Sequence, residues 1–317
     1  MKSAAFVALA ALCWGLSGGI GGVLLGNGWD AFVVAFYRGA AGLLFGLVWL
    51  LLRPHGSGLK NPRLWFWSVI AGLGVAGNFS FYFVSIGAGS VAVAATLMYC
   101  APVFVYLVSF GLKLEQPTPF NLTAIGVVIV GIVLLTGVYD LDAHAVTSTG
   151  LSAGLLAGLS YAVFIFGFKK AGRYGSPQAI LVIAFALLAA LLSWPGEAGR
   201  TLAALSSPDW SLFVALGVLG AGLSFIIYII GLRQTAPTVA SIVAMIEPVT
   251  ASLFGVLFLN ERLASLQVVG LVLILVTVTA LSAFSNVKLR YVKHSLLVPL
   301  KHKLRKPGRR GKDSGSR

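Results

Sequence analysis

Ten apolar stretches of about twenty residues follow one another along this 317-residue chain, separated by short polar links. They lie near 3–25, 31–52, 64–87, 90–112, 120–139, 150–168, 177–194, 210–232, 237–259 and 265–285. The hydrocarbon core of a bilayer is about 30 Å thick, and a helix needs about 20 apolar residues to cross it. A soluble core does not need so many stretches of this length. The sequence therefore predicts an all-α membrane protein with ten transmembrane helices.

The charge of the chain is unevenly distributed. Charged residues make up only 10% of the sequence, against about 25% in soluble domains. Residues 288–317 carry eleven Lys and Arg and one acid, so the other twelve bases and eight acids leave only +4 of the net +14. We interpret 287–317 as a basic, disordered cytoplasmic tail close to anionic lipid, and not as a surface that binds nucleic acid.

Lys and Arg mark one set of helix ends. Outside the tail this set carries Lys2, Arg53, Lys60, Arg63, Lys113, Lys169, Lys170, Arg173 and Arg233. The opposite set carries Arg200 and Arg262 beside six acids. Cytoplasmic loops of membrane proteins carry an excess of Lys and Arg. With ten spans, this bias predicts that both termini lie in the cytoplasm.

The two halves of the chain resemble each other. Segment 91–102 (VAVAATLMYCAP) aligns without gaps with 237–248 (PTVASIVAMIEP), and the same offset brings Glu115 onto Glu261. Residues 10–14 align with 157–161, which pairs Trp14 with Tyr161. Each half holds five spans, an odd number, so the copies must be inverted relative to each other. We predict repeats over 1–140 and 141–286 that exchange inward-open and outward-open conformations.

A family resemblance rests on Glu247-Pro248 in the ninth span, on 254–262 (FGVLFLNER) behind it, and on 11–15 (ALCWG). These motifs resemble the EamA-type members of the drug/metabolite transporter superfamily, over about residues 3–285. The resemblance implies ten helices in two inverted repeats, alternating access and export of small solutes across a bacterial-type inner membrane. Within the family the chain looks most like the aromatic amino-acid exporters. It departs from a symmetric pattern because Ala101 stands where the second half has Glu247.

Two charged residues lie inside predicted spans, Arg38 in the second and Glu247 in the ninth. A charge at the bilayer centre costs about 2.5–3.5 kcal/mol on insertion scales and usually faces the bundle interior or a wet cavity. Glu247 could titrate during transport, and Arg38 could hold a substrate carboxylate. Alternatively, the two could pair with each other or with backbone ends and merely lock helices, Glu247 could repair the helix where Pro248 interrupts it, or Arg38 could extend to the membrane surface.

Four aromatic residues lie within spans rather than at their ends: Trp14, Tyr82, Tyr99 and Tyr161. A buried Trp or Tyr needs a polar partner. At helical spacing, Ser17 is a candidate polar partner for Trp14, and Asn78 and Ser85 are candidate partners for Tyr82. Trp14 and Tyr161 would face each other across the pseudo-two-fold axis. We predict that these aromatic residues and Asn78 line a pocket for a flat apolar solute, with plain helix packing as the alternative.

Pro102 and Pro248 lie at equivalent places in the fourth and ninth spans. Proline interrupts helical hydrogen bonding, and interrupted helices at corresponding positions of two repeats point to the central site of a transporter. We predict that both prolines are hinges. A static kink that serves packing is the alternative.

Signals of enzymatic chemistry are weak. The four histidines lie in links or in the tail, Cys13 and Cys100 lack metal-ligand spacing, and no phosphate-binding loop is present. We therefore expect no enzyme activity, no cofactor and no metal. The expected partners are a small-molecule solute and the lipid bilayer, without nucleic acid; the oligomeric state stays open, and a monomer fits the sequence. A membrane-embedded enzyme for lipid-like substrates and a channel or scaffold are the alternative functions.

Overall fold

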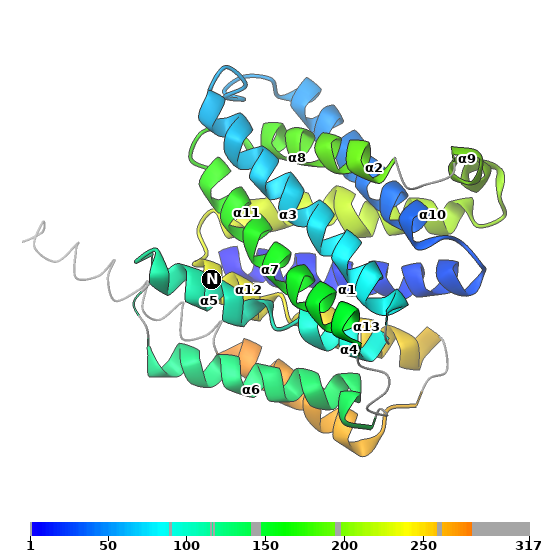
Figure 1. Cartoon of the computed structure of the whole chain (residues 1–317). Helices are drawn as coiled ribbons and strands as arrows, with labels where there is room; N and C mark the ends of the chain where they lie inside the picture. The colour runs from blue at the N-terminus through cyan, green and yellow to red at the C-terminus, as the bar shows by residue number, and fades with distance from the viewer. Residues whose placement is uncertain are drawn as a thin grey trace, which may run out of the picture.

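The computed structural model describes residues 2–88, 91–114, 116, 118–140, 147–193, 198–258 and 262–280. The described residues form helices and contain no β-strand (Figure 1), which confirms the expected all-α class. The elements are α1 (Lys2–Gly26), α2 (Ala31–Leu52), α3 (Pro62–Gly87), α4 (Val91–Met98), α5 (Ala101–Gly111), α6 (Pro119–Thr136), η1 (Val138–Asp140), α7 (Ser148–Ala171), α8 (Pro177–Leu192), α9 (Ala198–Ser206), α10 (Trp210–Gly217), η3 (Val218–Gly222), α11 (Leu223–Leu232), α12 (Pro237–Val243) and α13 (Ile246–Phe258). A last helix spans Ser265–Ala280. Glu115, Glu261 and the tail 287–317 lie outside the described residues.

The described residues contain eight helical segments that are long and apolar enough to cross a membrane. The other two expected spans, near 177–194 and 265–285, correspond to shorter apolar helices, α8 and Ser265–Ala280. A helix of 16 residues such as α8 is about 24 Å long, less than the bilayer core of about 30 Å. All ten predicted apolar segments thus contain helix, and within the described residues eight of them have the full crossing length.

Polar caps and prolines determine where many helices begin. The Asp30 carboxylate accepts a hydrogen bond from the Phe32 backbone N–H at 2.8 Å and thereby caps α2. Thr118 caps α6 through the Asn121 backbone N–H at 3.2 Å. Helices α3, α6 and α8 also carry proline in the first turn, where its missing N–H would have no helical partner. Local chemistry in the short links therefore sets where these spans begin.

Three spans are not continuous α-helices. The fourth breaks at residues 99–100, between α4 and α5, and the ninth breaks at 244–245, between α12 and α13. Pro102 and Pro248 follow these breaks by two and three residues. The eighth span contains η3, a π-helix, between α10 and α11. The fourth and ninth spans, which are equivalent in the two halves, are thus interrupted at nearly equivalent positions.

The first helices of the two halves run in opposite directions (Figure 1). The N-terminal end of α1 packs at the C-terminal end of α11, where a Cβ added to Gly231 would lie 2.7 Å from the Ser3 carbonyl oxygen. The C-terminal end of α7 reaches the same place, because Lys169 Nζ donates to the Leu232 carbonyl at 2.7 Å. Helices α1 and α7 are therefore antiparallel, as inverted repeats require.

Packing between the halves is reciprocal. Helix α3 packs on α7 and α1 packs on α11, while the second helices of the two halves, α2 and α8, pack on each other. Glycines permit the closest approaches. A Cβ added to Gly74 of α3 would lie 2.5 Å from the Phe164 backbone nitrogen, and one added to Gly167 of α7 would lie 2.7 Å from the Ala71 Cα. The interface between the halves thus brings backbones together in the middle of the bundle.

The bundle has a basic end and an acidic end. The basic end consists of the helix ends with Arg53, Arg63, Lys169, Lys170 and Arg233, where the Arg63 guanidinium lies 5.9 Å from the Tyr174 ring centroid. The acidic end carries Asp30, Asp140 and Asp209. Here Asn27 Nδ2 and Trp29 Nε1 donate to the Asp209 carboxylate at 3.0 and 2.7 Å. These bonds connect the α1–α2 link to the start of α10.

Candidate functional site

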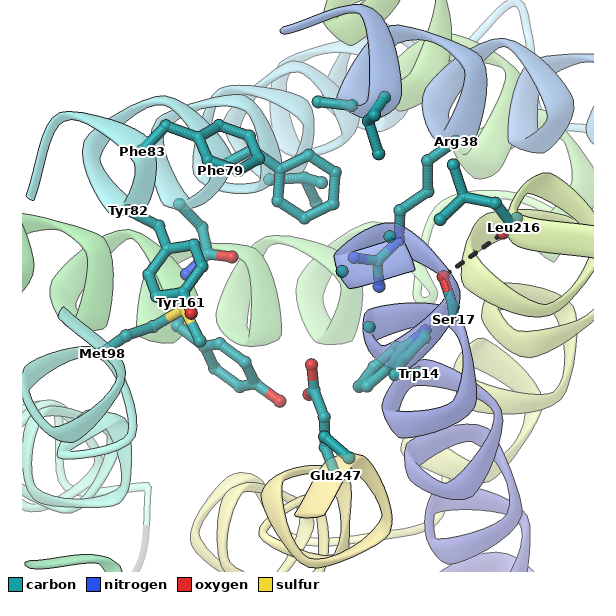
Figure 2. A pocket seen from close by; sticks show the side chains of 18 of the residues that line it. Trp14, Ser17, Arg38, Phe79, Tyr82, Phe83, Met98, Tyr161, Leu216 and Glu247 are labelled. Atoms are coloured by element: carbon teal, nitrogen blue, oxygen red, sulfur yellow. Dashed lines mark hydrogen bonds between the residues drawn. The ribbon is translucent and has the colours of Figure 1, made fainter. Parts of the chain in front are cut away.

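A cavity of about 400 Å³ lies between the two halves of the bundle (Figure 2). Its walls come from α1, α2 and α3, from the break between α4 and α5, and from α7, α10, α11 and α13. All seven residues that the sequence proposes for substrate binding line it: Trp14, Arg38, Asn78, Tyr82, Tyr99, Tyr161 and Glu247. The fold therefore brings the candidates together, and their role in binding stays a prediction.

Sequence reasoning missed part of the wall, namely Phe79, Phe83, Met98, Phe164 and Phe225. Some of these had a detectable signal. Phe79, Tyr82, Phe83 and Ile86 follow the i, i+3, i+4, i+7 spacing of a single helix face on α3. Phe164 and Phe225 had none, because aromatic residues on buried helices usually serve packing.

The polar neighbours expected to satisfy the aromatic side chains bond elsewhere. Asn78 Nδ2 donates to the Ala157 carbonyl at 3.0 Å, and Ser17 Oγ donates to the Leu216 carbonyl at 3.3 Å. Ser85 Oγ likewise donates to a backbone carbonyl of α7, at 2.7 Å. The predicted pairing with Trp14 and Tyr82 was wrong, because the close approach of neighbouring helices places their carbonyls within reach of these groups.

Aromatic rings fill the bundle on the basic side of the cavity. Trp14 packs on Phe225 and Tyr228, with ring centroids 5.0 and 4.9 Å apart, and Tyr161 packs on Phe164 at 4.4 Å. In Figure 2 Trp14 and Tyr161 lie on opposite sides of Glu247. Among the described residues, Trp14 Nε1 and the Tyr161 hydroxyl have no hydrogen-bond partner. Both residues line the cavity, and a role of these two groups in binding stays a prediction.

The cavity extends from this cluster toward the acidic end. On α1 its wall runs from Trp14 to Leu25, and on α3 it runs from Val75 to Ile86. Both helices end at the acidic end. On both helices, no residue between the middle of the helix and the basic end lines the cavity. The cavity is thus closed toward the basic end and reaches the acidic end.

Arg38 points into the cavity instead of extending to the membrane surface (Figure 2). Its Nε donates to the Gly220 carbonyl of η3 at 3.1 Å. Its guanidinium carbon lies 4.8 Å from the Phe79 ring centroid, which is a cation–π contact. A backbone carbonyl and an aromatic face therefore hold this charge inside the bundle.

Glu247 faces the same cavity from α13, across from Arg38 (Figure 2). Pro248 has no N–H for the Ala244 carbonyl one turn before it. That carbonyl accepts a hydrogen bond from the Glu247 backbone N–H at 2.9 Å, and not from the Glu247 carboxyl group. In the described part of the chain, no ion pair joins Glu247 to Arg38. Mutual pairing and repair by the Glu247 carboxyl group are thus not seen, whereas Arg38 does pair with a backbone carbonyl, and both charges face the cavity.

The two prolines predicted as hinges lie beside the cavity wall. Pro102 follows Tyr99, and Pro248 follows Glu247 directly. Both proline residues are buried. Motion at these breaks would therefore move wall residues, and the hinge role stays a prediction.

The described residues contain no group of three His, Cys, Asp or Glu side chains that could hold a metal.

Two antiparallel halves with interrupted helices around a cavity in the middle of the bundle are the architecture of secondary transporters. Comparison with known proteins agrees with this class. The sequence matches the EamA-like transporter family twice, over residues 1–137 and 148–283, and the chain belongs to this family. It is therefore a multi-pass membrane transporter and not an enzyme.

Several relatives are transporters by name. An uncharacterized transporter of Archaeoglobus fulgidus is 32% identical over 197 residues, which cover 61% of this chain and 68% of the relative. The threonine/homoserine exporter RhtA of Escherichia coli K12 is 26% identical, with 67% of this chain and 68% of RhtA covered. Protein PecM of Dickeya dadantii is 28% identical, with 75% of this chain and 84% of PecM covered. A solved crystal structure, 18% identical in sequence, has the same fold with a TM-score of 0.71. The match covers 90% of this chain and 98% of the solved chain.

Proposed function

We propose that this protein exports small amphipathic metabolites, above all aromatic amino acids, by alternating access of its two halves around the central cavity. One observation carries the proposal. The cavity between the inverted halves presents a guanidinium, a carboxyl group and several aromatic rings to the same space. An amino acid with an aromatic side chain has a complementary group for each of them.

The dimensions and chemistry of the cavity support this substrate class. A volume of about 400 Å³ lies within the range of about 300–1,000 Å³ for small-molecule sites. Such sites are mainly apolar with a few placed polar groups, and Trp14, Tyr82, Tyr99 and Tyr161 supply flat apolar walls with polar edges. The name of the relative RhtA, a threonine/homoserine exporter, supports export of amino acids in general.

The distribution of charge supports a direction. Lys and Arg mark cytoplasmic helix ends, so we assign the basic end and both termini to the cytoplasm. The cavity, which reaches the acidic end, then represents the outward-facing state. Repeats over 1–140 and 141–286 would exchange this state with an inward-facing one through bending at Pro102 and Pro248.

Purified protein in sealed lipid vesicles tests the substrate. We expect saturable uptake of labelled phenylalanine, tyrosine and tryptophan, with competition between them and weaker competition by threonine and homoserine. Protein-free vesicles are the control. Absence of saturable, competable uptake of every aromatic amino acid would remove the substrate claim, and linear uptake without saturation would favour a channel.

A second measurement tests the role of Glu247 in coupling. Flux is compared with and without a pH gradient in the wild type and in Glu247→Gln, which keeps the size of the side chain and removes its ability to ionise. We expect the gradient to change wild-type flux and to leave the flux of the variant unchanged. Identical responses of both proteins would exclude Glu247 as the coupling acid.

A further inference from the structure

The π-helix η3 contacts Arg38, a residue of the cavity wall, from behind that wall. Within η3 the Leu223 backbone N–H bonds the Val218 carbonyl, five residues back, so this turn of the eighth span is wider than an α-helical turn. The Gly220 carbonyl in the same turn accepts the hydrogen bond from Arg38 Nε at 3.1 Å. Such π-turns occur frequently at functional sites. The widened turn therefore supplies the acceptor that holds Arg38.

The absence of a side chain at Gly220 lets Arg38 lie against η3. A Cβ added to Gly220 would lie 2.7 Å from Arg38 Nε and 2.9 Å from Arg38 Cγ, and it would also meet Ser17 Oγ. On its other side the guanidinium lies 4.8 Å from the Phe79 ring centroid. The side chain is thus held between a backbone carbonyl and an aromatic ring, and its conformation is set before any solute enters.

The two Nη groups of the Arg38 guanidinium are not used by the hydrogen bond to Gly220. Arginine has five N–H donors, and the bond to Gly220 uses the one on Nε. Among the described residues, neither Nη group of Arg38 has a hydrogen-bond partner, and no carboxylate forms an ion pair with it. A charge inside a membrane protein usually marks a substrate or ion pathway. The planar fork of two Nη groups matches the two oxygens of a carboxylate.

We propose that Arg38, held by η3, binds the carboxylate of the transported solute, and that Glu247 across the cavity receives its ammonium group. The solute is then a zwitterionic α-amino acid, oriented with its carboxylate toward α2 and its side chain among Tyr82 and Tyr161. This inference rests on the proposed function of the cavity as the solute site. It adds the recognition group, the orientation of the solute and the reason for the widened turn.

Three related ligands test the two charged groups of the solute one at a time. Phenylalanine has both charged groups, phenethylamine lacks the carboxylate, and 3-phenylpropionate lacks the ammonium. We expect Arg38→Lys, which keeps the charge and loses the fork, to weaken binding of both carboxylates by about 10- to 100-fold, the loss of a charged hydrogen bond. Binding of phenethylamine should change less than about 2-fold because no contact is removed. Titration of the purified protein by calorimetry or thermal shift measures each affinity.

Two glycine variants test the contribution of η3. Gly220→Ala would push Arg38 aside, and we expect the same selective loss of carboxylate ligands. Gly222→Ala, in the same π-helix, is the matched control, because its Cβ would meet the Phe45 ring of α2 at 2.9 Å and not Arg38. We expect it to leave the preference between carboxylate and amine ligands unchanged. Equal losses for all three ligands in Arg38→Lys would overturn the proposal.

A panel of other amino acids distinguishes this inference from the aromatic substrate claim. If phenylalanine does not bind but aliphatic amino acids bind in a manner that depends on Arg38, the aromatic claim fails and the carboxylate site stands. If no carboxylate ligand of the panel binds the wild type, or if those that bind are insensitive to Arg38→Lys, the carboxylate site is disproved.

Discussion

Gly15 of α1 lies directly against the backbone of Glu247: a Cβ at this glycine would be 2.5 Å from the Glu247 carbonyl oxygen. It would also lie 2.5 Å from Thr250 Cβ. Both neighbours belong to α13, and neither can rotate away like the end of a long side chain. The carboxyl group that faces the cavity is therefore positioned by a helix contact that only glycine permits.

Gly15→Ala should destabilise the protein and displace Glu247. We expect overpacking to cost about 1–3 kcal/mol, more than the roughly 1 kcal/mol that alanine contributes over glycine inside a helix. The midpoint of thermal unfolding in detergent and the uptake rate would both fall. Gly126→Ala in α6 is the control, because nothing lies within 4 Å of its added Cβ. A midpoint raised equally in both variants would show that α1 and α13 are not in tight contact.

Tyr161→Phe and Tyr228→Phe should separate stability from binding. Both hydroxyls are buried without a hydrogen-bond partner among the described residues, but only Tyr161 lines the cavity. Because an orphan buried hydroxyl costs about 1–3 kcal/mol, we expect both substitutions to raise the unfolding midpoint. Only Tyr161→Phe should weaken phenylalanine binding, by about 2- to 10-fold, the value of one neutral hydrogen bond. Equal affinities in the two variants would remove the Tyr161 hydroxyl from the solute site.

Lys169→Met should weaken the closed basic end. Lys169 Nζ donates to the carbonyls of Leu232, Arg233 and Thr235 at 2.7, 3.0 and 2.6 Å, and so joins the end of α7 to the end of α11. A cation at the C-terminus of a helix also interacts favourably with the helix dipole. We expect a loss of about 1–3 kcal/mol, measured as a lower unfolding midpoint.

The matched control for this prediction is Lys60→Met, which removes the same charge from an exposed link at the basic end. Its unfolding midpoint should stay near the wild-type value, because surface charges contribute little. Indistinguishable midpoints for the Lys169 and Lys60 variants would show that the carbonyl contacts of Lys169 do not stabilise this state.

Pro248→Ala should make the ninth span more continuous. Alanine supplies the N–H that proline lacks, and this donor can bond the Ala244 carbonyl in a regular α-helical turn. We expect a higher unfolding midpoint together with slower exchange of labelled for unlabelled solute across vesicles, because the break can no longer bend freely. Pro119→Ala, at the first turn of α6, is the control and should leave exchange unchanged. Unchanged exchange in Pro248→Ala would favour the static kink.

Much of the architecture was predictable because it depends on properties of single segments. The apolar lengths, the clustering of Lys and Arg and the alignment of 91–102 with 237–248 are visible in the sequence. The observed breaks near Pro102 and Pro248 follow from the missing proline N–H.

The candidate site was predictable in its residue types but not in its contacts. A charge or a tyrosine inside an apolar span is conspicuous in sequence, which is why Arg38, Glu247 and Tyr161 could be named. Their partners are not conspicuous. Ser17 bonds the Leu216 carbonyl rather than Trp14, and Phe225 is indistinguishable in sequence from an aromatic residue that only packs.

The sequence by itself determined that this chain crosses a membrane repeatedly in two related halves, because hydrophobic length and repetition are one-dimensional properties. Only the tertiary structure decided which face of each helix borders the cavity and which end of the bundle is closed. Arg38 and Gly220 are 182 residues apart in the chain. Their contact depends on the packing of α2 against η3 and on the widened turn of η3, both of which belong to the packing between the halves.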